Sequence, residues 1–69
     1  MIKFKLHIKL AEHRMKQIEL AELTNIRPAT ISAYCNDTNK HIVKEHLDMF
    51  CKIFKCSVSD LIEFEEDIN

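Results

Sequence analysis

Three cysteines and two nearby histidines are the residues of this chain that could hold a metal. Cys35, Cys51 and Cys56 would supply the thiolate ligands that zinc prefers. His41 or His46 would add an imidazole. The spacing argues against such a site, because the sequence contains no CxxC or HxxxH pair. We therefore expect reduced, mostly packed thiols, with no metal and no cofactor.

Catalytic chemistry has equally little support. No Cys/His or Ser/His pair stands in a local context typical of a nucleophilic enzyme. Residues 57–69 are rich in carboxylates, but a flexible acidic segment offers no pocket that would shift their pKa values for acid–base work. We expect no catalytic residues and a protein that is not an enzyme.

The charges are divided unevenly along the chain. The 69 residues carry a formal net charge of −1, yet all ten lysines and arginines precede residue 57. Residues 57–69 contain five acids and no base, and residues 63–69 form an acidic tail. Since a phosphate backbone responds to the local face of a protein, this division allows nucleic-acid binding with the tail turned away.

The elements that would position these residues are helical. The chain has no glycine and one proline, and its apolar spacing is helical in most windows. No apolar run is long enough to cross a membrane and the N-terminus does not resemble a signal peptide, so we expect a cytoplasmic protein. The predicted fold is all-α, a single domain over residues 1–69, with helices over residues 6–13, 17–24, 28–35, 44–54 and 58–62.

Several of these boundaries have a physical cause. Pro28 suits the first turn of a helix, where its missing N–H is not needed. Asn25 suits a left-handed residue in the turn that precedes this helix. Ser57 followed by Asp60 has the form of a capping box, and residues 36–39 form a loop by composition.

The two ends of the chain allow two interpretations. Residues 1–5 alternate apolar and basic side chains, and residues 63–66 place Phe64 among acids. The two segments could pair as short β-strands, because opposite charges on facing strands attract each other. Frayed termini are the alternative.

Residues 17–36 are the informative stretch, with two short helices joined by a tight turn. Ala21 is small where the two helices must approach closely, and Ile26 fills the wedge between them. Ile31 holds the second helix against the core. The inner face of the first helix is expected to consist of Ile18 or Leu20, together with Ala21 and Leu23.

The second of these helices has an outer face suited to DNA. With Ile31, Tyr34 and Cys35 facing inward, helical spacing turns the opposite side outward. This outer face is small and nearly uncharged, so it could enter a major groove without steric conflict. Arg27 is a neighbouring side chain able to form paired hydrogen bonds to a base edge. The outward residues are Pro28, Ala29, Ser32, Ala33 and Asn36, and Asn36 adds a second donor of that kind.

The pattern Gln-x-x-Leu-Ala, followed by Asn-Ile and a further Ile, over residues 17–31 resembles the helix-turn-helix of the Cro/C1 repressor family, also called XRE-like regulators. Residues 46–54 resemble the fourth helix of that family, and residues 56–62 resemble its closing segment. The resemblance covers about residues 6–62 and is nearest to short single-domain bacterial and phage members. It implies a five-helix, lambda-repressor-like DNA-binding domain.

The resemblance also implies a function and a set of contacts. It implies a sequence-specific transcriptional regulator, acting as a repressor, that inserts the helix at 28–35 into the major groove of double-stranded DNA. Lys16 and Gln17 would contact a phosphate at the start of the preceding helix. The complete set of implied DNA-binding residues is Lys16, Gln17, Arg27, Pro28, Ala29, Thr30, Ser32, Ala33, Asn36, Lys40 and His41.

The sequence departs from the family pattern at several positions. Asn25 replaces the usual glycine of the turn, and Arg27 stands where a capping Ser or Thr is usual. Val43 likewise offers no polar cap to the fourth helix, at a cost of about 1 kcal/mol. Leu10 and Cys35 take the places of a buried Arg–Glu pair, an exchange that can be neutral or stabilising.

The assembly and the DNA target are less closely specified. A monomer of this size would contact few base pairs, so we expect a homodimer. Its interface would be the N-terminal strand, the Phe64 segment or the surface of the last two helices. The reading face has few paired donors, which predicts an A/T-leaning site read partly by shape. The alternative function is a protein-interaction module, such as an antitoxin or anti-repressor, with weak DNA binding.

Overall fold

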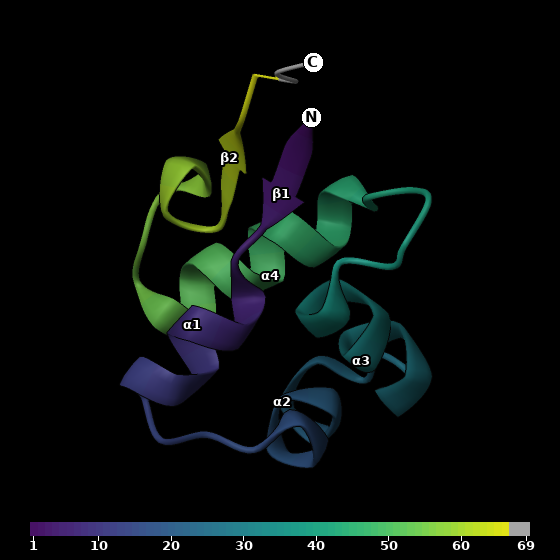
Figure 1. Cartoon of the computed structure of the whole chain (residues 1–69). Coiled ribbons are helices and arrows are strands. Elements are labelled where there is room, and N and C mark those ends of the chain that lie inside the picture. Colours follow the sequence, from purple (N-terminus) through teal and green to yellow (C-terminus); the bar gives the residue numbers. More distant parts are fainter. Residues whose placement is uncertain (67–69) are drawn as a thin grey trace.

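The computed structural model describes residues 1–66, so the end of the acidic tail, including Asp67, lies outside the described residues. Within these residues, four α-helices pack together at one side of a short two-stranded sheet, in which the first strand lies beside the last (Figure 1). Within residues 1–66, no helix is long and apolar enough to cross a membrane. In chain order the elements are β1 (Ile2–Phe4), α1 (Leu6–Glu12), α2 (Gln17–Thr24), α3 (Pro28–Asn36), α4 (Lys44–Phe54), the 3₁₀ turn η1 (Val58–Asp60) and β2 (Ile62–Phe64).

The expected fifth α-helix over residues 58–62 is not confirmed. The chain forms only the single 3₁₀ turn η1 there, because it must extend again at Ile62 to pair with β1. The expected capping contact at this turn is present. The carboxylate of Asp60 accepts a hydrogen bond from the backbone N–H of Ser57 at 3.1 Å.

The pairing of the two ends is confirmed, so the fold is mostly helical with a small sheet. β1 and β2 are antiparallel, with Ile2 opposite Phe64 and Phe4 opposite Ile62. Lys3 lies opposite Glu63, so the charged pair projects from the sheet face opposite to the apolar pairs. Backbone pairing therefore ties the first and last described segments together.

A cluster of aromatic side chains forms the centre of the core. The rings of Phe4 and Tyr34 stack with centroids 4.9 Å apart, and Phe50 packs edge-on against both. Leu6 and Leu10 on α1 are buried against this cluster, as the sequence predicts. The core thus joins β1, α1, α3 and α4.

The inner face of α2 corrects one expectation. Leu20, Ala21 and Thr24 are buried, whereas Ile18 is 52% exposed and Leu23 is 63% exposed. Ile18 and Leu23 each lie ~100° around the helix from the centre of the buried stripe, so they cannot reach the core. Thr24 is buried where the sequence predicts Leu23, and its hydroxyl keeps a hydrogen-bond partner there, the carbonyl of Leu20.

Candidate nucleic-acid interface

The turn between α2 and α3 is built without glycine. Asn25 adopts the left-handed conformation, with φ 59° and ψ 23°. The hydroxyl of Thr24 donates to the carbonyl of Leu20 at 2.8 Å and accepts the N–H of Ile26 at 3.3 Å. These two bonds close the end of α2 and direct the buried Ile26 into the angle between the helices.

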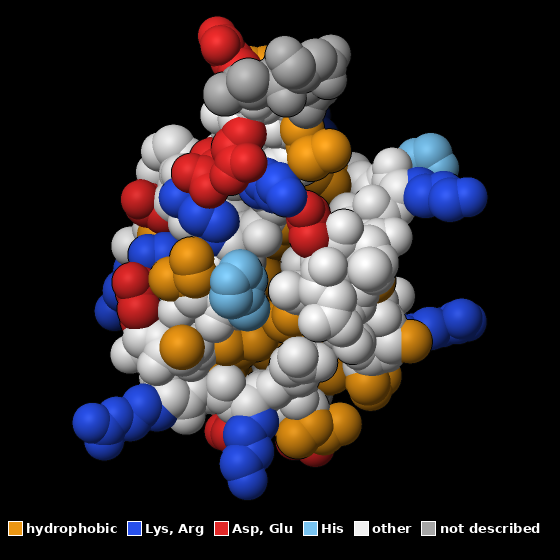
Figure 2. All heavy atoms as spheres, viewed as in Figure 1, with side chains coloured by type: hydrophobic (Ala, Val, Ile, Leu, Met, Phe, Trp, Pro, Cys, Tyr) orange, Lys and Arg blue, Asp and Glu red, His pale blue; other side chains and the backbone are white. Residues whose placement is uncertain are grey.

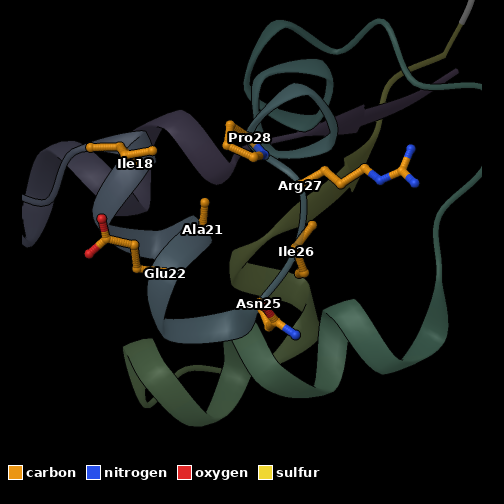
Figure 3. A pocket seen from close by; sticks show the side chains of 7 residues that line it. All are labelled: Ile18, Ala21, Glu22, Asn25, Ile26, Arg27 and Pro28. Atoms are coloured by element: carbon orange, nitrogen blue, oxygen red, sulfur yellow. The ribbon is translucent and has the colours of Figure 1, made fainter.

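Arg27 starts α3 through its backbone and leaves its side chain to solvent. Its carbonyl accepts hydrogen bonds from the N–H groups of Thr30 and Ile31, at 3.0 and 3.1 Å. No side chain caps this helix end, as the sequence predicts, and Pro28 occupies the first turn. Figure 3 shows the exposed Arg27 guanidinium extending away from α2.

A hollow lies between α2 and the start of α3, beside the turn. Its wall is apolar on the inner side, and Glu22 supplies a carboxylate on the α2 side (Figure 3). Sequence reasoning did not single out Glu22, although it lies one turn after Ile18 on the same helix face. The lining residues are Ile18, Ala21, Glu22, Asn25, Ile26, Arg27 and Pro28.

The outer face of α3 agrees in part with the expected outward set, since Ser32 and Ala33 are only half-exposed. Pro28, Ala29 and Asn36 are exposed, and the three other predicted residues on this helix are half-buried. The Asn36 amide donates to the hydroxyl of Ser32 at 3.3 Å, so one of its donors is already engaged within the helix. The half-buried residues are Thr30, Ser32 and Ala33.

The start of α2 places Lys16 and Gln17 at the surface. The carboxylate of Glu19 accepts the N–H of Lys16 at 3.1 Å, which is one half of a capping box. This carboxylate sits where a phosphate would approach the helix N-terminus. The helix end itself is therefore a weaker anion site here, and the side chains of Lys16 and Gln17 remain free to reach a backbone.

The loop from Asp37 to Val43 carries the last two predicted residues, Lys40 and His41, both exposed. Its first residue is tied to the sheet, because the Asp37 carboxylate accepts the backbone N–H of Phe4 at 3.2 Å. Its last residue is tied to α3, because the hydroxyl of Tyr34 accepts the N–H of Val43 at 3.2 Å. The loop is thus anchored at both ends beside α3.

The acidic side chains are distributed unevenly over the surface. On the face shown in Figure 2, they gather toward the end that holds the terminal sheet, with some basic side chains among them, and other basic side chains project singly from the remaining edges. The predicted DNA-contacting set contains Lys16, Arg27 and Lys40 and no acid. Within the described part of the chain, no group of three or more His, Cys, Asp or Glu side chains could hold a metal ion.

Comparison with known proteins agrees with this geometry. The model of the Cro/C1-type HTH DNA-binding domain family matches residues 5–67. A relative from Bacillus subtilis (strain 168), the uncharacterized HTH-type transcriptional regulator YozG, is 32% identical over 60 residues, which span 87% of this chain and 71% of the relative. No solved structure matches the chain.

Proposed function

The chain belongs to the family of Cro/C1-type helix-turn-helix DNA-binding domains, and from this membership we propose that it represses transcription by inserting α3 into the major groove of its operator. The observation that carries the proposal is the α2–turn–α3 unit. Ala21 and Ile26 are buried where the two helices meet, whereas Pro28 and Ala29 are exposed on the outer side. A helix with small exposed residues can approach base edges closely. An antitoxin or anti-repressor role is not favoured by the comparisons.

The contacts divide into two kinds. Arg27 extends from the start of α3 and supplies the strongest donor for a base edge or an adjacent phosphate. Lys16 and Gln17 on one side and Lys40 and His41 on the other side bind the flanking phosphates, which sets the position of α3 without reading sequence. The outer residues of α3 supply apolar and hydroxyl contacts, and they are Pro28, Ala29, Thr30, Ser32, Ala33 and Asn36.

We further propose that the protein binds DNA as a homodimer through the terminal sheet. Ile2 is 52% exposed and its cross-strand neighbour Phe64 is 68% exposed, which extends the apolar side of the sheet beyond the core. The sheet lies at the opposite end of the molecule from α2 (Figure 1). A second copy on the sheet would therefore leave both reading helices free for two half-sites.

The function is tested by selecting bound duplexes from a random pool of DNA. The selected duplex is then titrated with protein at several salt concentrations. We expect an A/T-leaning consensus, because the α3 surface offers methyl contacts and few paired donors. We also expect the affinity to fall steeply with added salt. The absence of binding at low salt would favour the protein-interaction alternative, and a G/C-rich consensus would refute the proposed readout.

A further inference from the structure

Cys51 and Cys56 form a pair of thiols at the C-terminal end of α4. The helix ends through Lys55, which adopts the left-handed conformation with φ 52° and ψ 50°. The backbone N–H groups of Lys55 and Cys56 both point to the carbonyl of Cys51, the latter at 3.1 Å. This turn folds Cys56 back toward Cys51, so the two thiols lie at the same end of α4.

The two cysteines are partly exposed to solvent and lie near charged side chains. Both thiols are half-buried, so a small reagent can reach them, whereas Cys35 is buried in the core. Lys9 of α1 and Asp60 of η1 lie close enough to Cys56 to affect the pKa of its thiol. The ammonium of Lys9 also binds the carboxylate of Glu12 at 3.0 Å, which holds it near the pair.

We propose that Cys51 and Cys56 are a modification site that closes to an intramolecular disulfide when the protein meets a peroxide. A disulfide needs Cβ atoms about 3.8 Å apart, and the hydrogen bond from the Cys56 N–H to the Cys51 carbonyl brings the two residues together on one turn. Contact between these side chains also belongs to this kind of helix end.

The reaction balances with hydrogen peroxide as the oxidant. The thiolate of one cysteine attacks a peroxide oxygen, the O–O bond breaks, and the hydroxide released takes up a proton to leave as water. The resulting sulfenic acid is attacked at sulfur by the second thiol, the S–O bond breaks, and another water leaves. The two sulfur atoms together lose two electrons, and the peroxide is reduced to two molecules of water.

The local electrostatics set the pH dependence of this step. Burial raises the pKa of the Cys56 thiol above its ordinary value, the adjacent Cys51 raises it further, and Lys9 opposes the shift. A raised pKa leaves less thiolate at neutral pH, so oxidation accelerates as the pH increases. Cys35, whose pKa is also raised by burial, is shielded by the core as well.

The site lies away from the proposed DNA surface. α4 begins beside the loop that carries Lys40, and Cys51 follows Val43 by about 12 Å along the helix axis. Oxidation is therefore expected to leave DNA affinity within about twofold of the reduced protein, which corresponds to less than ~0.5 kcal/mol.

Treatment of the whole protein with hydrogen peroxide, followed by thiol titration after denaturation and peptide mapping, tests the site. We expect two of the three thiols to disappear, the mass to fall by ~2 Da, and one peptide pair to link Cys51 to Cys56. Cys35→Ala should behave like the wild type, whereas Cys51→Ser and Cys56→Ser should form no internal bridge. The peptide map of the wild-type chain gives the answer even if a variant fails to fold. Linked dimers, oxidation of a single cysteine to sulfinic acid, or three unreacted thiols would each overturn the proposal.

Discussion

The hydroxyl of Tyr34 lies 2.8 Å from Nδ1 of His46 and thereby joins the proposed reading helix to α4. The same hydroxyl accepts the N–H of Val43, so its single proton is available for the lone pair of His46 Nδ1. The rings of Tyr34 and His46 also meet edge-on, with centroids 5.7 Å apart. One buried tyrosine thus fixes the end of the loop that carries Lys40 and His41.

Replacement of Tyr34 by phenylalanine tests this link. We expect Tyr34→Phe to lower the free energy of unfolding by about 1–2 kcal/mol, because Val43 and His46 each lose a part-buried partner while the ring stacking remains. DNA affinity should fall as well, because the loop is less well held. Urea unfolding and DNA titration measure the two effects, and Phe54→Leu, at a buried position near the other end of α4, is the control that disturbs the core away from the loop. Unchanged DNA affinity in Tyr34→Phe would contradict the positioning role.

Arg27 is expected to dominate the charge-dependent part of DNA binding. Arg27→Ala should weaken binding about tenfold, and if the contact is to phosphate it should reduce the slope of log affinity against log salt by ~1. Lys52→Ala on α4 removes the same charge from a side chain that is paired with Asp48 at 3.0 Å, and it serves as the matched control. Equal losses in the two variants would show that only net charge matters.

Glu22 is expected to oppose DNA binding from the hollow beside the turn. Glu22→Gln removes one negative charge next to Arg27 and Pro28, so affinity should rise about two- to fivefold at low salt. The gain should shrink as salt is added, because the repulsion is screened. Asp48→Asn on α4, whose carboxylate is paired with Lys52 at 3.0 Å, removes the same charge outside the proposed DNA and dimer surfaces; it is the control and should change affinity much less.

Lys55 carries backbone strain that glycine would relieve. A residue with a Cβ atom at φ 52° is disfavoured, so Lys55→Gly should raise the free energy of unfolding by about 0.5–1 kcal/mol. Lys52→Gly, within the helical part of α4, should instead lower it by about 1 kcal/mol. Thermal or urea unfolding of the two variants distinguishes the positions, and a loss of stability in Lys55→Gly would be evidence against strain there.

Asp60 is expected to contribute to acid sensitivity. The backbone N–H and the hydroxyl of Ser57 hold the pKa of the Asp60 carboxyl below its ordinary value, so the charged form favours the folded state. This stabilisation is complete above the ordinary carboxyl range near pH ~4 and is lost as the pH falls through the lowered pKa. Asp60→Asn keeps an acceptor for Ser57 but cannot titrate. The stability difference between wild type and variant should therefore be largest at neutral pH and vanish in acid; a difference that is independent of pH would exclude this cause.

Much of the helical framework follows from local sequence. The bounds of α2 and α4 agree with those predicted, and those of α1 and α3 differ by one residue, because Pro28, Asn25 and the apolar spacing act over a few residues. The roles of the predicted DNA contacts remain predictions, although the structure exposes Arg27 and Lys40 at the surface. The fifth helix is not confirmed, because the length of the turn at Val58–Asp60 depends on the pairing of Ile62 with a strand distant in sequence.

Local chemistry therefore accounts for the turn, the uncapped helix starts and the buried positions of Ile26 and Ile31, since each depends on spacing that can be read along the chain. Other features require residues far apart in sequence to meet. The hydrogen bond from the Phe4 N–H to the Asp37 carboxylate joins residues 33 positions apart. The hydrogen bond between Tyr34 and His46 depends on how α4 packs against α3. Only packing in three dimensions decides such pairs, because no local pattern states which of many polar side chains will be adjacent once the core has formed.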